Sequence, residues 1–458
     1  MIFAVMRVMN LVMRKNILSF FVLMLAIVAI IACGKSARAQ DTLKLSLSDA
    51  ISIALENNYQ IRINRQELIK AQNNNTQGAA GRYPSINFNL SQANNFNNNE
   101  IFFQEAFRNE TRSSSLTPSV ALDWTLFDGF RVNITKENLE KLEELSEGNL
   151  SLVVESTIQS IILAYYNVLL QNEKLDVFEE VKTLSRDRFR YEETRKQFGS
   201  SVTFDVLQAK DAYLSDSVNY LQQELNLQNA MLLLKLLMAL DEETQFVLTD
   251  DFAVETYDYN IDTLKRRMLR DNRGLTNQYI NQRILENSTE LAKSEVYPGL
   301  YMGAGGDYST SRVKNNDNDP RNTYSFGYYV NFTLSFNIYN GGATRRAIQN
   351  ALIDEEIGLI TISELQKTLT NQLQNQYDLY EIRKQLLAVA EASRESTGLN
   401  LQISEEKFRT GAINSFNFRD IQLRYINSSI RRLEAVYDLI DTETELLRLT
   451  GGIVSGEE

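Results

Sequence analysis

The chain has no histidine, one cysteine and only four prolines in 458 residues. The lack of histidine removes the usual general base, the commonest metal ligand and the usual pH switch of proteins. A single cysteine, Cys33, excludes an internal disulfide and a thiolate metal site. Linkers rich in proline, glycine or serine are also missing, which argues against a string of small domains. We therefore expect a protein that is not an enzyme, with no cofactor and no bound metal.

Residues 1–39 have the features of an export signal. A basic start at Met13–Asn16 precedes the apolar core Ile17–Ala32, and a small-residue cleavage site ends at Ala39. The apolar core is short for a membrane span. A second interpretation is a lipobox ending at Cys33, which would make that cysteine a lipidated N-terminus.

Export fixes the compartment of the mature protein outside the inner membrane. The formal net charge is −12, and the leader holds five positive residues and no acidic ones, so the mature chain carries −17. An acidic surface of this size repels nucleic acid. We expect no nucleic-acid partner.

The sequence repeats itself once, at a spacing of about 212 residues. Matching landmarks keep nearly this spacing: two Tyr-Pro pairs (Pro84, Pro298), two glycines (Gly129, Gly341) and two turn glycines (Gly199, Gly411). Each half is expected to run helix, strand, loop, strand, very long helix, glycine turn and helix. The proline-free runs 130–197 and 343–408 would form helices roughly 100 Å long.

The helices after the two turn glycines carry heptad-like apolar spacing, which is typical of helices packed side by side. The residues are Leu207, Leu214, Val218, Leu221 and Leu225 in the first half, and Ile426, Ile430, Leu433, Tyr437 and Ile440 in the second. We expect both rows to lie in seams between neighbouring helices.

Four segments alternate apolar and polar residues and predict strands at about 84–92, 117–128, 299–309 and 324–339. Asparagine-rich segments, 92–100 and 314–322, are expected to be loops on an exterior face. The strand ends carry aromatic residues, as the interface girdles of membrane barrels do: Tyr83, Trp124, Phe127, Tyr297 and Tyr339. A soluble, half-buried sheet also alternates, but the girdle and the polar loops favour a membrane barrel.

Four strands are too few to close a barrel, because known barrels need about eight or more. An open sheet in lipid would leave backbone groups unpaired. The barrel is therefore expected to be shared among identical chains. Beyond the leader no apolar run reaches 18 residues, so no helix is expected to span a bilayer.

On these motifs the chain resembles the TolC family of outer-membrane efflux proteins over essentially its whole mature length. The opening Leu45–Gln72, the Tyr-Pro junctions, the "FDG" and "YNGG" exits and the closing Leu446–Gly451 are all similar to the family. The resemblance implies a mainly α fold with a small membrane β portion. Duplicated long-helix hairpins would form a trimeric α-barrel, capped by a shared 12-stranded β-barrel with four strands per chain.

The resemblance also divides the chain. A first repeat spans 40–243 and a second spans 261–452, with a tail at 453–458. The connector between the repeats, 244–260, would join an equatorial belt beside Leu43–Leu47.

The function implied is an outer-membrane, periplasm-spanning channel of a tripartite efflux system. It would passively export small molecules that an inner-membrane pump and a periplasmic adaptor hand over, and its lipid partner would be the outer membrane. Two alternatives stay open: an exit duct for type I protein secretion, and a trimeric coiled-coil surface stalk.

Family members dock the adaptor at their periplasmic tips and close the pore just above them. The tip residues implied here are Phe198, Gly199, Ser200, Thr203, Thr410, Gly411, Ala412 and Ser415. The gate residues implied are Asp205, Arg409, Asn417 and Asp420, with Asp205 and Arg409 as candidates for a tie between helices. Asn417 departs from the family, since relatives often carry aspartates at both of the last two gate positions; three copies of Asp420 would still favour cations.

Overall fold

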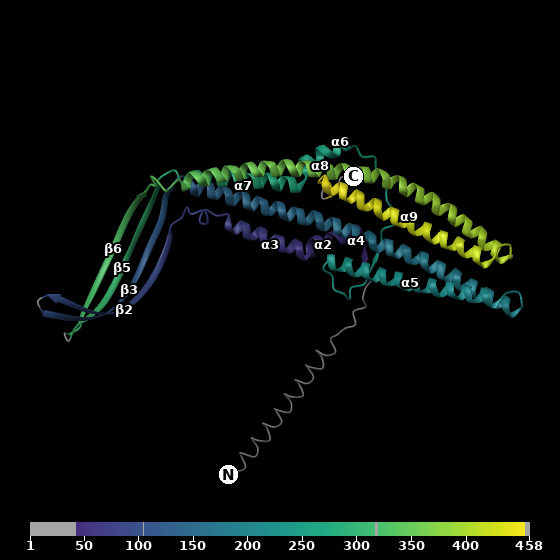
Figure 1. The fold of residues 1–458 in the computed structure, drawn as a ribbon, viewed down its shortest axis with the longest axis horizontal. Helices are drawn as coiled ribbons and strands as arrows, with labels where there is room; N and C mark the ends of the chain where they lie inside the picture. Colours follow the sequence, from purple (N-terminus) through teal and green to yellow (C-terminus); the bar gives the residue numbers. More distant parts are fainter. Residues whose placement is uncertain (1–42, 104, 317–318, 454–458) are drawn as a thin grey trace, which may run out of the picture. The chain divides into compact units, whose positions relative to one another are not determined.

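The computed structural model describes residues 43–103, 105–316 and 319–453. The predicted leader, with Cys33, and residues 454–458 of the predicted tail lie outside this part of the chain. In the first half the elements are β1 (Leu43–Leu45), α2 (Leu47–Asn57), α3 (Tyr59–Asn74), β2 (Ser85–Phe103), β3 (Glu105–Asp128), α4 (Arg131–Gln197) and α5 (Thr203–Leu237). In the second half they are β4 (Phe246–Leu248), α6 (Ile261–Asp271), α7 (Arg273–Ser294), β5 (Gly299–Asn315), β6 (Arg321–Ser335), α8 (Ala343–Arg409) and α9 (Ser415–Leu449). The chain is mainly helical with a small β portion, as its sequence predicts (Figure 1).

The two halves follow the same order of elements. Helices α4 and α8 are each 67 residues long, and α5 and α9 are each 35 residues long. At 1.5 Å per residue the longer pair spans about 100 Å. Both halves lie in one compact unit, Leu47–Ala239 together with the chain from Asp251 onward. The repeats are therefore packed together rather than separate domains.

A second, small unit contains β1 and β4. These strands pair in parallel, with Leu43 opposite Phe246 and Leu45 opposite Leu248. The backbone N–H of Thr249 extends the pairing by donating to the carbonyl of Leu45 at 3.1 Å. The start of the chain and the start of the connector are thus neighbours in space, and the equatorial belt stays a prediction.

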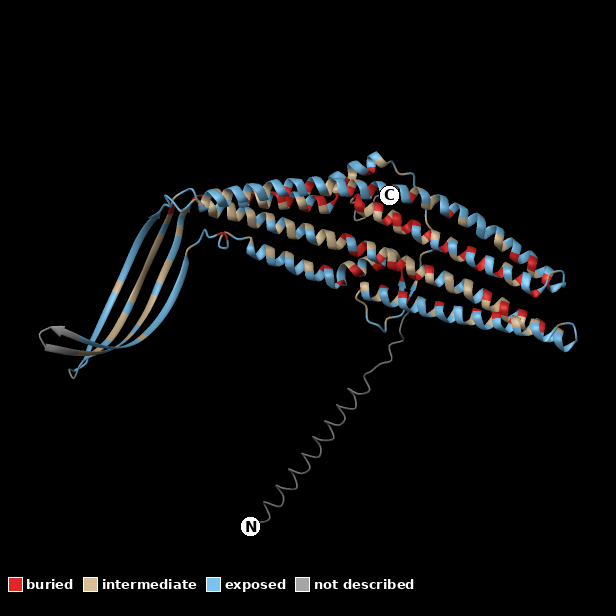
Figure 2. Cartoon of the chain, viewed as in Figure 1, coloured by how far each residue is buried: buried red, intermediate tan, exposed pale blue. Residues whose placement is uncertain are grey.

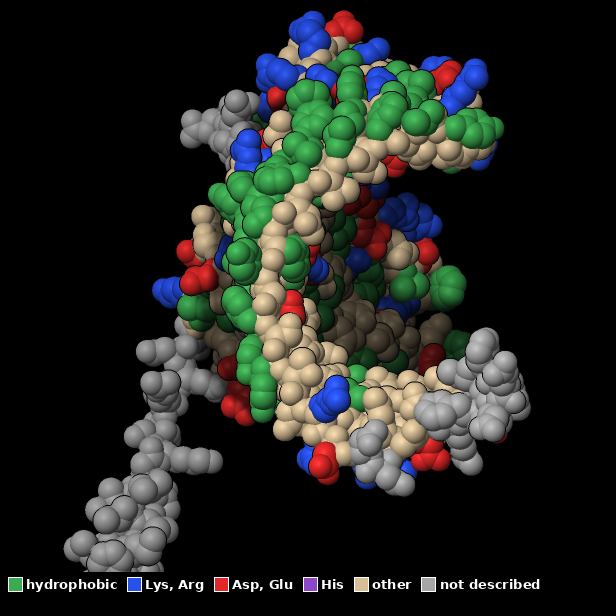
Figure 3. All heavy atoms as spheres, turned by 90° about the vertical axis from the view of Figure 1, so that its left-hand side faces the viewer, with side chains coloured by type: hydrophobic (Ala, Val, Ile, Leu, Met, Phe, Trp, Pro, Cys, Tyr) green, Lys and Arg blue, Asp and Glu red, His purple; other side chains and the backbone are tan. Residues whose placement is uncertain are grey.

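The four longer strands form one antiparallel sheet in the order β2-β3-β5-β6. One row of the sheet aligns Ile86, Leu122, Ala304 and Val330, and the row three residues along β2 aligns Asn89, Ser119, Asp307 and Gly327. Because successive residues face opposite sides, the register gives the sheet one apolar and one polar face. Figure 3 shows hydrophobic side chains gathered along the strands, and a mostly polar surface nearer the strand tips.

The strands are longer at the hairpin ends than their own sequences suggest. The asparagine-rich segment 92–100, expected to be a loop, lies within β2 and pairs with residues 108–116 of β3. Most of 314–322 differs less, since Lys314 ends in β5 and Asn322 starts in β6. Asparagine has a low strand propensity, but pairing with a neighbouring strand overrides that preference.

At the helical ends the strands differ from expectation in two further ways. Strand β6 stops at Ser335 rather than near 339, because its partner β5 begins opposite it at Gly299. The residue before Gly299 is Pro298, which has no N–H to extend the ladder. A bulge in β3 also places Phe127, and not Leu126, opposite Leu300, so that Phe127 joins the apolar face.

The long helices pack as two antiparallel hairpins, α4 with α5 and α8 with α9, and α7 packs against both α4 and α8. Buried residues follow the facing sides of the helices, whereas the sheet is exposed or half-buried (Figure 2). The main core includes Leu170, Tyr380, Leu433 and Leu439.

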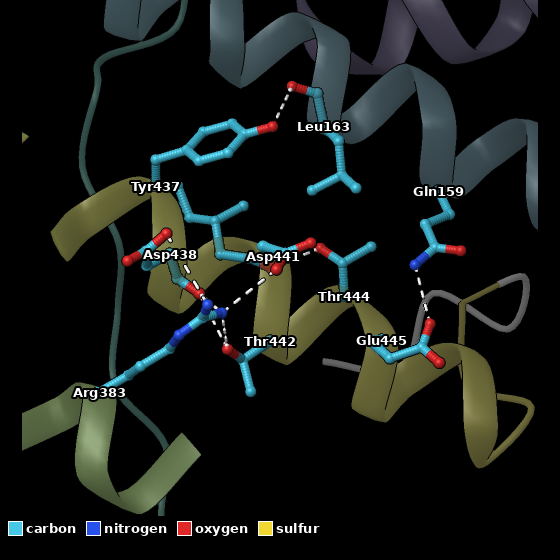
Figure 4. Close-up of polar contacts among 10 residues, drawn as sticks. Gln159, Leu163, Arg383, Tyr437, Asp438, Asp441, Thr442, Thr444 and Glu445 are labelled. Atoms are coloured by element: carbon cyan, nitrogen blue, oxygen red, sulfur yellow. Dashed lines mark hydrogen bonds and ion pairs between the residues drawn. The ribbon is translucent and has the colours of Figure 1, made fainter. Parts of the chain in front are cut away.

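Polar contacts also join α9 to its two neighbours (Figure 4). From α8, Arg383 lies 3.2 Å from the carboxylate of Asp441 and also contacts Thr442. From α4, the Gln159 amide donates to Glu445 at 2.8 Å. The second-half hairpin is thus fixed to the first half by side chains as well as by apolar packing.

The two heptad rows behave differently. In α9, Ile426, Leu433 and Ile440 are buried within the chain, as expected. In α5 the whole row is exposed, with Val218 at 64%. The prediction that the α5 row packs in a seam of its own chain is therefore wrong. Helix α5 meets α4 through its other face, where Ala209, Ala212 and Gln223 are buried.

Among the described residues one helix, α4, is apolar enough over an 18-residue window to cross a membrane by length and composition, with mean hydropathy 1.3. This finding differs from the expectation that no such run exists. Ile158, Ile161 and Tyr165 of α4 are buried against neighbouring helices. A core helix passes the same test, so the window is weak support for a membrane span.

Candidate functional site

The two helix hairpins end in matching turns. The N–H of Ser200 donates to the carbonyl of Arg195, and the N–H of Ala412 donates to that of Lys407, both at 2.8 Å. This six-residue closure is the Schellman motif, which needs a left-handed residue before its last position. Gly199 and Gly411 supply it, with φ of 74° and 77°. The repeated glycines of the sequence therefore mark the two tips.

Apolar side chains are exposed at both tips. Phe198 is 80% exposed, and Val202 is exposed beside it. Phe204 and Phe416, one turn beyond the tips, are also exposed and lie 212 residues apart in the sequence. The sequence interpretation missed this second pair, although the repeat spacing gives it. Together the four side chains form an exposed apolar surface at the tips, where the adaptor contacts are predicted.

The four predicted gate residues do not pair with one another in this part of the structure. Arg409 Nη2 lies 2.5 Å from the carboxylate of Glu405, and Arg424 Nε lies 2.8 Å from that of Asp420. Both pairs are one turn apart on a single helix. The backbone N–H of Asn417 donates to the side chain of Asn414, which caps α9. Among the described residues of one chain, no ion pair joins Asp205 to Arg409.

A different ion pair joins the two hairpins a few turns above the tips. Both guanidinium Nη atoms of Arg419, from α9, lie 2.7 Å from the two carboxylate oxygens of Asp216, from α5. The Asp216 side chain is only 3% exposed, and it also accepts a hydrogen bond from Ser185 of α4. This bidentate geometry is the strongest form of an arginine–carboxylate contact. No spacing in the sequence connects positions 203 residues apart, so sequence reasoning could not find it.

Arg188 lies beside this ion pair and is almost fully buried. Burial, together with the neighbouring Arg419 guanidinium, lowers the pKa of Arg188 to about 10. The side chain still carries its charge at neutral pH, and its Nη1 lies 3.4 Å from the carbonyl of Ser415. Its Nε and Nη2 have no hydrogen-bond partner within the described chain.

An aromatic cluster lies next to the ion pair on the side of the tips. The rings of Phe408 and Phe418 stack at 5.0 Å, with 4° between their planes. Tyr191 of α4 meets Phe408 edge-on at 5.4 Å. Aromatic contacts and a buried ion pair thus hold α4, α5, α8 and α9 together near their tips.

The predicted girdle residues lie near the helical ends of the strands. The indole N–H of Trp124 donates to the carbonyl of Arg82 at 3.0 Å. Phe130 links Phe127 and Tyr297 through edge-on contacts at 5.3 and 6.1 Å. Tyr83 and Tyr339 are exposed. Phe130 belongs to the same aromatic group and was missed, because it lies beyond the strand.

Two hairpins of 100 Å helices joined to a four-stranded sheet with one apolar face define a class: outer-membrane channel proteins with a helical extension. The model of the outer membrane efflux protein family matches residues 50–240 and 265–452, one segment in each repeat. The chain belongs to this family, the TolC-like family that its sequence resembles. It is an outer-membrane efflux channel.

Solved structures of outer-membrane channels share the fold. The chain is similar to the Campylobacter jejuni channel CmeC, with 14% identity over 90% of this chain and 87% of that one and a TM-score of 0.70. For the open state of Neisseria gonorrhoeae MtrE the identity is 14%, over 92% and 94% of the two chains, with a TM-score of 0.65. For the channel OprN it is 15%, over 89% and 90%, with a TM-score of 0.68. Among curated protein sequences, none matches this chain.

Proposed function

We propose that three copies of this chain assemble into one periplasm-spanning duct, whose twelve strands close a single barrel in the outer membrane. The observation that carries this proposal is the open four-stranded sheet with an apolar face. In the described sheet β2 and β6 each pair on one side only. Open edges in hydrocarbon leave backbone groups unpaired at several kcal/mol each. Pairing the edge of one copy with that of the next removes this cost.

The exposed α5 row supports the same assembly at the level of the helices. Leu214, Val218 and Leu221 form a stripe that nothing in their own chain covers. A seam with heptad spacing packs best against another long helix. Neighbouring copies would supply that helix and so build an α-helical barrel below the membrane.

The duct passively exports small molecules that an inner-membrane pump delivers through a periplasmic adaptor. Exposed Phe198, Val202, Phe204 and Phe416 support an adaptor contact at the tips, since exposed apolar clusters mark protein interfaces. Gating is then a shift between closed and dilated packings of the helices, biased by the adaptor.

The constriction is proposed just above the tips. Asp205, Arg409, Asn417 and Asp420 lie within the first or last turns of the tip helices. In a trimer each would be present three times around one axis. The Glu405–Arg409 pair would open when Arg409 turns toward Asp205.

Conductance tests the proposed channel directly. The refolded mature protein is added to planar lipid bilayers, and stepwise pore currents are expected. A coiled-coil surface stalk would give no current, and folded protein without current would contradict the channel. Type I secretion would use the same duct, so small-molecule accumulation is measured in cells with and without the protein. Equal accumulation, together with loss of a secreted protein, would favour secretion over efflux.

A further inference from the structure

Three basic side chains lie on the apolar face of the sheet, just beyond its last apolar row. Across the sheet, Phe96 faces Arg112, and Arg112 faces Lys314. One row closer to the helices, Ser114 faces Arg312. These rows follow in strict alternation from the row of Leu116, Thr310 and Tyr324. Arg112, Arg312 and Lys314, called the outer basic cluster below, therefore point to the side of the sheet that carries the apolar residues.

The position of this cluster fits the depth of a membrane. From Phe127 to Leu116 the strand rises roughly 37 Å at about 3.4 Å per residue. With the strand tilt of about 40° usual in barrels, this covers roughly 29 Å of depth, close to the apolar band of about 25 Å. Arg312 and Arg112 begin two and four residues past Leu116 in the sheet. They fall at the level of the headgroups and not within the hydrocarbon.

The cluster has uncompensated positive charge. Like charges directly opposite each other on neighbouring strands are unfavourable, and Arg112 faces Lys314 in this way. All three side chains are exposed. Within the described residues none of them has an ion-pair partner. Glu110, two residues from Arg112 on the same face, is the nearest acidic position along that strand.

A shallow groove accompanies the charges. It has a volume of about 380 Å³ and is lined by the three basic residues together with Asn94, Phe96 and Ser114. The Arg112 guanidinium lies over the Phe96 ring, 5.2 Å from its centre, which holds it flat against the surface. Amide and hydroxyl donors beside two guanidinium groups suit the oxygen atoms of a phosphate.

We propose that the outer basic cluster binds phosphate groups of lipids in the outer leaflet, and so anchors the sheet at a fixed depth. The partner is a phosphorylated lipid rather than a free anion, because the groove continues directly from the apolar rows that would contact the acyl chains. This inference rests on the proposed membrane barrel. It adds to that proposal a lipid class and the residues that recognise it.

Lipid binding to single-site variants tests the proposal. The refolded full mature protein is titrated in detergent with bis-phosphorylated lipid A, and retained lipid is counted by native mass spectrometry. Each basic residue near a charged membrane surface contributes about a fivefold gain in binding. We expect Arg112→Gln and Arg312→Gln each to lose about fivefold in affinity, and the triple Gln variant to lose on the order of 100-fold.

The matched control is Arg321→Gln. Arg321 pairs with Val313 and so lies near the same end of the sheet but on the opposite, polar face. Its affinity should stay within about twofold of the parent, because its charge lies on the side away from lipid. An equal loss in Arg321→Gln would reduce the effect to overall charge and overturn the inference. So would unchanged binding in the triple variant.

Two probes identify the source of the phosphate. Dephosphorylated lipid A should bind parent and triple variant alike. Inorganic phosphate at the same concentration should not displace the lipid; displacement would mean that the site takes the free anion. Pore conductance is measured on every protein used. Variants that conduct normally but bind lipid like the parent refute only the lipid site, whereas a parent that never conducts refutes the channel itself.

Discussion

Breaking the Asp216–Arg419 ion pair should destabilise the helical part of the molecule. Asp216→Ala leaves the Arg419 guanidinium without its partner at a site where both groups are largely removed from water. Losing one partner of a buried pair costs about 3–5 kcal/mol, and Arg419 keeps 18% exposure, so we expect about 3 kcal/mol. Denaturant unfolding followed by circular dichroism measures the loss.

Two comparisons make this result specific. Asp420→Ala removes an exposed pair with Arg424 and should cost under about 1 kcal/mol. Replacing both buried partners, Asp216→Leu with Arg419→Met, should restore most of the stability, because apolar groups of similar size need no partner. Equal losses for Asp216→Ala and Asp420→Ala would show that the buried pair has no special role.

The proposed gate predicts a leak. Asp205→Ala with Arg409→Ala removes charges near both tips, and the closed packing should lose population to the dilated one. We expect the double variant to conduct several-fold more than the parent in planar bilayers without an adaptor. Conductance equal to that of the parent would reject Asp205 and Arg409 as gate residues and leave the channel itself in place.

The pH dependence of stability should reflect Glu443, which holds the connector on α9. Tyr259 donates a hydrogen bond to this carboxylate at 2.7 Å, but burial dominates and raises the pKa of Glu443 above its ordinary value. Between the ordinary and the raised pKa the folded chain binds more protons than the unfolded chain. Stability contributed by this group therefore falls as pH rises through that window.

Glu443→Gln cannot ionise and still accepts the hydrogen bond from Tyr259. Its stability relative to the parent should rise between pH 4 and pH 7, by about 1.4 kcal/mol for each unit of pKa shift. The measurement is the unfolding free energy at several pH values. Glu434→Gln, on the same helix and half-exposed beside Lys174, should show no such gain. A constant difference between Glu443→Gln and the parent would mean that burial of this carboxylate carries no cost.

At the scale of elements, the exposed row of α5 should decide assembly. Leu221→Asp places a charge in the proposed seam between copies, whereas Gln222→Asp places the same charge one residue away at another exposed position. A buried, unpaired carboxylate costs several kcal/mol. Leu221→Asp should lose the trimer in detergent and keep its helical content, and Gln222→Asp should keep both. Loss of the trimer in both variants would point to charge alone.

Much of the element pattern could be predicted from the sequence. The proline-free runs gave the two long helices to within a few residues, because nothing in them interrupts a helix. The repeat spacing gave both tips through Gly199 and Gly411. The length of β2 could not be predicted, since asparagines enter a strand here only because β3 pairs with them. Heptad spacing likewise gave the α5 stripe but not the copy that covers it.

The contacts between halves were beyond the reach of the sequence. Asp216 and Arg419 meet because four helices pack with one particular offset near their tips. The predicted tie between Asp205 and Arg409 used positions close to the turns, where the helices of one chain already satisfy Arg409 locally. Motif positions thus located the region, and only packing identified the partners.

At the scale of the whole molecule, the mass of the detergent-solubilised protein tests the central claim most directly. The sheet of one copy has two open edges and needs two further copies to close in lipid. Native mass spectrometry, with circular dichroism to confirm the strands, should give a species of three chains. A stable single chain that keeps its full β signal would contradict the account.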